Sequence, residues 1–171
     1  DGTRQFWIKD KLVSERNIDN TKKFSHISNI LKNVNAILDG EIYLPFKTVF
    51  DVNRKSNWNK VKYVVFDILE LEGKDLRTLQ LRERIRILTE LIDNNLNILR
   101  DVLSVNIPAQ FPAVDVAWDY ITENKLEGLV IKDLSSTYSL KDIFTEERRK
   151  SWIKVKYWKE GKEKIVDFEK G

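Results

Sequence analysis

The stretch Ala36-Ile-Leu-Asp-Gly-Glu-Ile-Tyr-Leu44 decides how this chain is expected to fold. Its apolar residues bracket one polar insertion, and the β-branched and aromatic residues among them favour extended backbone. Asp39 and Glu41 stand two positions apart, so in a strand both side chains point to the same face. Gly40 between them lets another backbone or a ligand approach closely. We therefore predict a buried strand that presents two carboxylates; the alternative is a strand-end turn with two solvated acids.

Composition limits the class of protein. A chain of 171 residues can bury a sizeable core, and 42% hydrophobic with 33% charged residues is typical of one globular domain. The lack of cysteine excludes disulfides, zinc–thiolate sites and cysteine nucleophiles, and the single His26 argues against His-based metal cages. No apolar run is long enough to span a membrane. Because the net charge is only +3, any nucleic-acid binding would depend on local basic patches.

The apolar periodicity predicts an α+β domain of antiparallel β-sheets flanked by helices. Period-two patterns predict a hairpin and further strands at 4–13, 61–71, 98–107, 126–133, 152–158 and 164–169. Helical spacing predicts helices that begin after a cap at 19–21 and end near 34, and at 79–92 and 114–124. The segment 51–60 is predicted to be a polar loop, and Arg82, Arg84 and Arg86 to be the solvated face of their helix.

Several side chains suit a nucleotide that carries phosphates. Lysines on strands that face one way can offset the charge of a polyphosphate, and carboxylates suit Mg²⁺. An aromatic face, here Phe66, suits a nucleobase. No glycine-rich phosphate loop is present, so a nucleotide site would be built from strand side chains. The candidate residues are the acids Asp1, Asp39, Glu41 and Glu127 and the cations Arg4, Arg16, Lys132, Lys154 and Lys156.

In their order along the chain, these residues resemble the motifs of the nucleotidyltransferase domain of ATP-dependent DNA ligases, a family related to RNA ligases and mRNA capping enzymes. The resemblance covers nearly the whole chain, and a ligase-like pattern from Gly73 to Arg84 favours DNA ligases over capping enzymes. The matching stretches are Asp1-Gly-Thr-Arg4, Ser14-Glu-Arg-Asn17, Leu38-Asp-Gly-Glu41, Tyr63-Val-Val-Phe-Asp-Ile-Leu69, Glu127-Gly-Leu-Val-Ile-Lys132 and Trp152-Ile-Lys-Val-Lys156. The family usually has arginine directly after the serine of the second stretch, where this chain has Glu15.

The resemblance implies a ligase adenylation-domain architecture, similar to ATP-grasp folds, with ATP and Mg²⁺ as cofactors. It implies a role for each candidate. Glu41 would bind the ribose and Phe66 would stack on adenine, while Lys154 and Lys156 would contact the α-phosphate. Arg4 would touch the nucleotide or the nick phosphate, and Asp1 would belong to the catalytic motif. Arg16, with a one-residue offset, and Lys132 would help to bind the nucleotide, and Glu127 with Asp39 would hold the metal.

The resemblance also predicts how the chain relates to its parent protein. The family's nucleophile is a lysine two residues before the Asp-Gly pair, a position that would precede Asp1. We therefore expect residues 1–171 to be an adenylation domain truncated before Asp1 and lacking the OB-fold domain that follows it in the family. The parent enzyme would form lysyl-AMP, pass AMP to a 5′-phosphate and seal the nick. Expected partners are ATP or AMP and nicked double-stranded DNA, for an intracellular (cytoplasmic or nuclear) monomer without membrane association.

Two other classes of protein stay open at this point. One is a different covalent nucleotidyltransferase, either an RNA ligase or a capping enzyme. The other is a non-catalytic nucleic-acid-binding module that keeps the fold, with a basic region from Arg148 to Lys164 as its footprint. A preference for GTP over ATP would point to the first alternative. A lysine two positions before Asp1 would support an enzyme, and its absence would support the second alternative.

Overall fold

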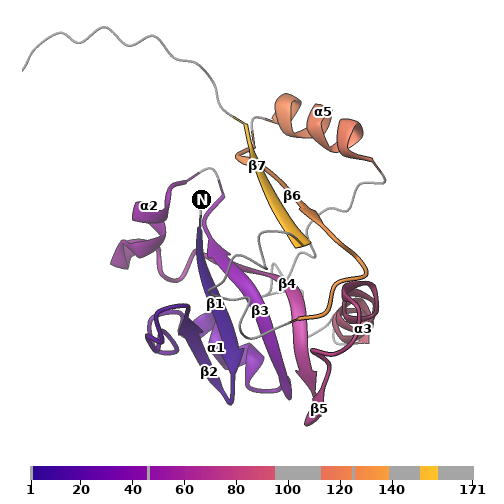
Figure 1. Ribbon diagram of the computed structural model, residues 1–171. Coiled ribbons are helices and arrows are strands. Elements are labelled where there is room, and N and C mark those ends of the chain that lie inside the picture. The colour runs from indigo at the N-terminus through magenta and orange to yellow at the C-terminus, as the bar shows by residue number, and fades with distance from the viewer. Residues whose placement is uncertain (1, 46, 95–112, 125, 139–150, 158–171) are drawn as a thin grey trace, which may run out of the picture.

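The computed structural model describes residues 2–45, 47–94, 113–124, 126–138 and 151–157 (Figure 1). It is the expected α+β arrangement of antiparallel sheets and helices. The strands expected at 98–107 and 164–169, Asp1 and most of the basic region lie outside the described residues. The elements are β1 (Gly2–Ile8), β2 (Lys11–Ser14), α1 (Ser25–Leu31), β3 (Ala36–Tyr43), α2 (Val49–Asn53), the 3₁₀ helix η1 (Lys55–Asn57), β4 (Lys62–Leu71), β5 (Lys74–Asp75), α3 (Leu81–Asn94), α5 (Val114–Asn124), β6 (Gly128–Lys132) and β7 (Trp152–Lys156).

The central element is β3, which is the strand expected at 36–44. It lies in the middle of a five-stranded antiparallel sheet with the order β2-β1-β3-β4-β5. Leu38 and Ile42 on one face belong to the hydrophobic core, and Asp39 and Glu41 point to the other face, as predicted. A Cβ on Gly40 would lie 2.4 Å from the Val64 carbonyl oxygen. The glycine is therefore needed for the close approach of β4.

A β-bulge in β4 shapes the face that carries the carboxylates. Asp39 pairs with Asp67, but the next residue, Gly40, pairs with Val65, so Phe66 is the extra residue in β4. A bulge lets two consecutive side chains leave the same face of a strand. The contacts agree, because Phe66 lies near Arg4 and Asp67 is near Asp39. The sequence pattern did not predict this irregularity.

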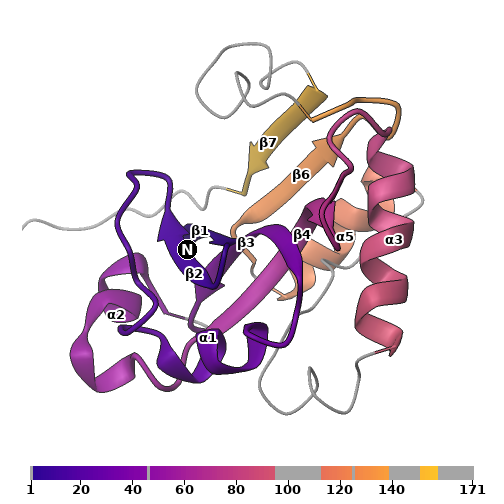
Figure 2. The ribbon, with the colours of Figure 1, turned by 90° about the horizontal axis from the view of Figure 1, so that it is seen from below.

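The opposite face of the sheet holds the core. Buried residues of α1 and of the segments beside it pack there against Trp7 and Tyr63, and α3 packs along β4 (Figure 2). The prediction of a loop at 51–60 is wrong for most of that segment, because α2 occupies Val49–Asn53 and η1 occupies Lys55–Asn57. Thr48 and Asp51 form a capping box, and Val52 is the buried residue of this short helix. One buried residue gives no apolar period to recognise.

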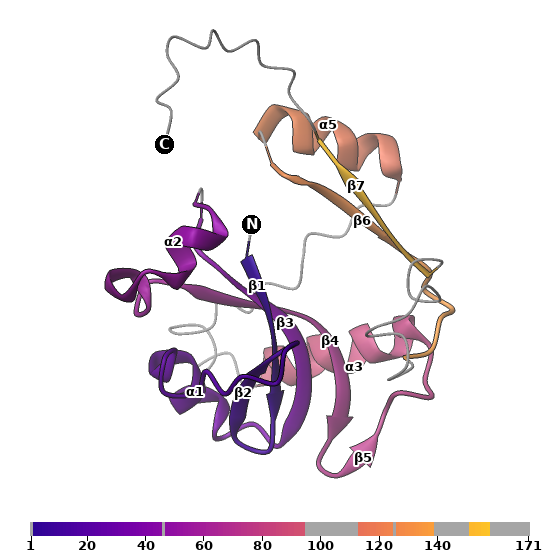
Figure 3. The ribbon, with the colours of Figure 1, turned by 60° about the vertical axis from the view of Figure 1, so that its left-hand side comes forward.

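A second, two-stranded antiparallel sheet is formed by β6 and β7. Trp152, Lys154 and Lys156 alternate along one face of β7, as predicted, and their partners in β6 are Lys132, Val130 and Gly128. Helix α5 lies against these strands on the side away from the large sheet (Figure 3). Trp118 of α5 makes an edge contact with Tyr157 at 5.9 Å between ring centroids. Within the described residues, no helix is both long and apolar enough to cross a membrane.

Candidate active site

The site begins with a buried ion pair between β1 and β3. Arg4 donates from Nε to Asp39 Oδ1 at 2.8 Å and from Nη2 to Asp39 Oδ2. Asp39 is fully buried, and the Tyr138 hydroxyl donates to its Oδ2 at 3.1 Å. Burial raises the pKa of Asp39, and the hydrogen bonds and charge of Arg4 act against that rise. The outer side of Arg4 donates from Nη1 to Glu15 Oε1 at 3.1 Å. The guanidinium is thus held on two sides by carboxylates.

Phe66 forms the centre of an aromatic and cationic cluster. The Lys132 ammonium lies 4.8 Å from the Phe66 ring centroid and 4.0 Å from that of Trp152. The two rings meet edge to face, with centroids 5.7 Å apart. Burial lowers the pKa of Lys132 to about 8, although Asp67 and Asp39 act to raise it. A flat ring that stacked on Phe66 would therefore lie beside a lysine that loses its proton readily.

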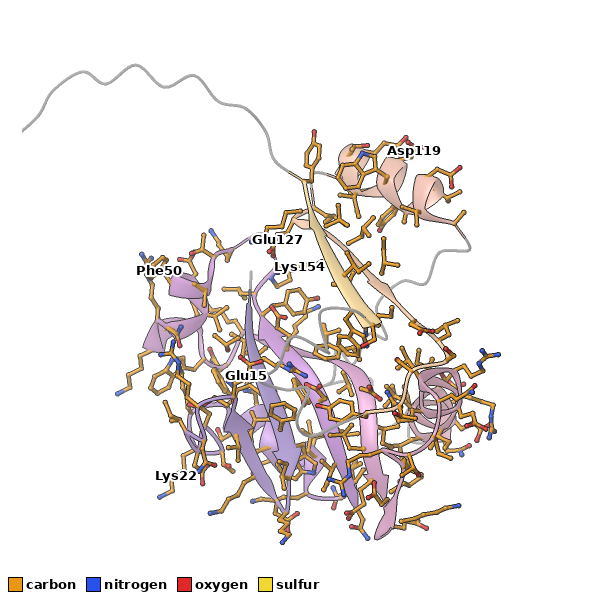
Figure 4. The ribbon with its side chains drawn as sticks, viewed as in Figure 1. Glu15, Lys22, Phe50, Asp119, Glu127 and Lys154 are labelled. Carbon is orange, nitrogen blue, oxygen red and sulfur yellow. The ribbon has the colours of Figure 1, made fainter. Side chains whose placement is uncertain are left out.

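Glu127 and the two lysines of β7 form the outer part of the site. Lys154 Nζ lies 3.0 Å and Lys156 Nζ 3.2 Å from Glu127 Oε1. Partial burial acts to raise the pKa of Glu127, but hydrogen bonds from both lysines hold it down at about 2. Figure 4 shows Glu127 and Lys154 side by side, beyond the edge of the large sheet. Burial raises the pKa of the nearby Glu41, and the Lys154 charge opposes that rise. Two carboxylates and two ammonium groups thus lie within electrostatic reach of one another.

A second buried ion pair joins α3 to β4, next to the residues of the site. Arg84 of α3 donates to both oxygens of Asp67, at 2.8 and 2.9 Å, and to the Leu79 carbonyl at 2.6 Å. The prediction of a solvated arginine face holds for Arg82 and Arg86 but is wrong for Arg84, whose side chain is 1% exposed. Arg84 stands three residues after Leu81 and four before Leu88, which places it on the apolar stripe. This spacing was the signal that could have identified it.

The structure places the remaining candidates in different surroundings. Arg16 lies in the exposed turn after β2, and its neighbour Glu15 is the turn residue that contacts Arg4. Asp39 is buried with both oxygens engaged, so the expected role as a metal ligand does not fit it. Among the described residues, no group of three or more acidic, histidine or cysteine side chains could hold a metal ion. Three residues at the site were not predicted from the sequence: Glu15, Tyr138 and Trp152.

Comparison with known proteins identifies the family of this chain. Residues 1–156 match the family described as ATP dependent DNA ligase domain, and the chain belongs to that family. It is 33% identical over 156 residues to DNA ligase 3 of Dictyostelium discoideum, covering 81% of this chain and 12% of that protein. It is 32% identical over 168 residues to a DNA ligase of Methanoculleus marisnigri, covering 85% of this chain and 28% of that protein. The chain therefore spans only a small part of these relatives.

Solved structures show the same fold. A mycobacterial DNA ligase D complexed with ATP and MES matches with a TM-score of 0.67 at 22% identity, over 93% of this chain and 52% of that one. The ligase domain of Mycobacterium tuberculosis LigD matches with a TM-score of 0.65 at 22% identity, over 81% of this chain and 47% of that one. The expected fold, that of a ligase adenylation domain, is thereby confirmed.

Proposed function

We propose that this chain is the adenylation domain of an ATP-dependent DNA ligase that seals nicks through lysyl-AMP and DNA-adenylate intermediates. The observation that carries the proposal is the meeting of the two sheets. Glu41 of β3 lies within electrostatic reach of Lys154 and of Glu127, which precedes β6. Phe66 of β4 contacts Lys132 of β6 and Trp152 of β7. These strands are far apart in sequence. Their meeting supplies a stacking surface, a ribose-binding acid and cations for one nucleotide.

The proposed chemistry begins with ATP in this site. Adenine stacks on Phe66, Glu41 accepts a hydrogen bond from the ribose, and Lys154 and Lys156 face the α-phosphate. A lysine amine, two residues before Asp1 in the parent protein, attacks the α-phosphorus after losing a proton, and pyrophosphate leaves. Negative charge on the phosphate oxygens increases during this step, and fixed ammonium groups stabilise that charge.

Magnesium suits the acidic end of the site. Mg²⁺ is usually held by one or two carboxylates together with phosphate oxygens and waters. Glu127 is ionised and 36% exposed, so it could hold the ion beside the phosphates after exchanging its lysine contacts. The ion would supply positive charge that neutralises the phosphates.

The later steps involve the parent protein and DNA. AMP passes to the 5′-phosphate of nicked double-stranded DNA, and the 3′-hydroxyl then attacks this phosphate and releases AMP. Arg4 would reach a phosphate by exchanging its Nη1 contact with the 46%-exposed Glu15, while Nε and Nη2 stay on Asp39. An OB-fold domain after this one, a monomeric state and an intracellular location are part of the same proposal.

The test of this assignment uses the chain extended at its N-terminus by Lys-x. Lys154→Ala should slow AMP attachment about 100-fold or more, the usual cost of losing one transition-state contact, while the Kd for ATP rises far less. Lys74→Ala, on the exposed β5, is the matched control and should leave both quantities unchanged. Equal losses in rate and binding for Lys154→Ala would mean plain ground-state binding. Labelling from GTP in place of ATP would favour a capping-type enzyme.

A further inference from the structure

Tyr138 lies in the segment after β6 and reaches the buried ion pair of the large sheet. Its hydroxyl donates to Asp39 Oδ2 at 3.1 Å and lies 3.5 Å from Arg4 Nη2. The guanidinium of Arg84 lies over the tyrosine ring at 5.6 Å. Tyr138 therefore stands between the two buried ion pairs, Arg4–Asp39 and Arg84–Asp67.

The segment that carries Tyr138 is fixed to α3 and to the turn before it. The Leu81 amide donates to the Ser136 carbonyl at 2.8 Å and the Arg82 amide to the Leu134 carbonyl at 3.0 Å. The Tyr138 amide donates to the Arg77 carbonyl at 2.8 Å. The first amides of a helix have no partner within the helix, so these bonds satisfy both the helix and the segment. These bonds thus fix the backbone of Tyr138 independently of Asp39.

We infer that Tyr138 is a positioning residue, which fixes the Asp39 carboxylate and through it the orientation of the Arg4 guanidinium toward the phosphate. A carboxylate held by Arg4 alone could turn about its terminal torsion, which has a broad energy minimum. The hydroxyl, anchored from another element, removes that freedom. Small errors in the placement of a catalytic group slow the reaction. A residue that orients such a group therefore affects the rate without touching the substrate. The inference deepens the proposed function and rests on it for its effect on rate.

The positioning itself is tested without any reaction. In an NMR spectrum of the folded chain, exchange of the Arg4 Nε proton with water reports how firmly Asp39 holds it, and the Arg84 Nε proton is an internal control. Tyr138→Phe keeps the ring over which Arg84 lies and removes only the hydroxyl. We expect Arg4 exchange to become about fivefold faster, the factor for one hydrogen bond, with Arg84 unchanged. Unchanged Arg4 exchange, equal acceleration at both arginines or failure of the variant to fold would overturn the inference.

The effect on rate is measured with the Lys-x-extended chain. Tyr138→Phe should slow AMP attachment about tenfold and change the Kd for ATP less than about twofold, because the charge of Arg4 remains. In an Asp39→Asn background the same change should have no further effect. Tyr63→Phe is the control, since it removes a buried hydroxyl that donates to the Gln5 carbonyl at 3.0 Å on the core side. An additive loss in the Asp39→Asn background would contradict the inference. If the unmutated extended chain showed no AMP attachment, but Tyr138→Phe still accelerated exchange of the Arg4 Nε proton, the proposed function would be wrong. The positioning of Arg4 by Tyr138 would still be supported.

Discussion

At the scale of single residues, the site separates two kinds of carboxylate. Asp39 and Asp67 are fully buried, and each is paired with one arginine. An ionised carboxylate without partners is very costly to bury, so these acids serve the structure around the site. Glu41 and Glu127 are only partly buried and can change partners when a ligand enters. The acids that touch a nucleotide are therefore expected to be the latter two.

Phe66 gives the most direct test of the base pocket. If adenine stacks on its ring, Phe66→Ala should weaken ATP binding by about 1–3 kcal/mol, the range for base–aromatic stacking. Phe66→Tyr keeps the ring and should bind ATP nearly as well as the unmutated chain. Binding would be measured by calorimetry and folding by circular dichroism. A Phe66→Ala chain that stays folded and binds ATP with full affinity would show that the base lies elsewhere.

Lys132 predicts a dependence of ATP binding on pH. Its pKa of about 8 lies below the ordinary lysine value, so its charge is present below pH 8 and is lost as the pH rises through that value. ATP affinity should therefore fall between about pH 7 and 9, because ATP is an anion and a cation beside the base pocket loses its charge. Lys132→Arg keeps its charge over this range and should flatten the fall. The same decline in both proteins would assign the titration to another group.

Sequence spacing predicted contacts along a strand better than contacts between distant residues. The period of two correctly put Asp39 with Glu41, and Lys154 with Lys156 and Trp152. Tyr138 could not be found in this way, because 99 residues separate it from Asp39. The departure at Glu15 was visible, but its contact with Arg4 depends on the pairing of β1 with β2.

At the scale of elements, irregular features place the side chains of the site. The bulge in β4 brings Phe66 and Asp67 to one face. Gly128 at the start of β6 has φ 152°, and a Cβ there would lie 2.1 Å from the Val155 carbonyl oxygen. The glycine after Glu127 thus permits the close pairing with β7 that brings Lys154 and Lys156 to that acid. Periodicity predicted α5 and, among the described strands, β1 to β4, β6 and β7, but not the bulge or the short helices within 49–57, which lack a repeating pattern.

The anchoring of α3 to the large sheet can be measured by unfolding. Arg84→Met should destabilise the chain by about 3–5 kcal/mol, because it leaves the Asp67 charge buried and unpaired. Arg86→Met is the control: its side chain is 66% exposed and pairs with Glu90, so the change should cost less than about 1 kcal/mol. Urea unfolding would compare the two. Adding Asp67→Leu to Arg84→Met should restore part of the loss, and no recovery would mean that the cost lies in packing.

At the scale of the whole molecule, two sheets supply complementary parts of one site. The large sheet contributes Arg4, Glu41 and Phe66, and the small sheet contributes Glu127, Lys132, Lys154 and Lys156. The resemblance of the ordered motifs predicted that these residues serve one nucleotide site, but it did not predict their division between two sheets. Their relative placement in space could not be predicted from periodicity, which acts within single elements. We propose that this arrangement is already competent to transfer AMP when a lysine is supplied.

The most direct measurement is covalent labelling with α-labelled ATP and Mg²⁺, followed by denaturation. Three folded chains would be compared: residues 1–171 alone, the same chain extended by Lys-x, and the chain extended by Ala-x. We expect retained label only on the Lys-x chain, because positioning and charge stabilisation reside in the two sheets and only the nucleophile is added. Label on either of the other chains would mean that a different lysine is the nucleophile. A folded Lys-x chain without label would contradict the account and favour a non-catalytic module.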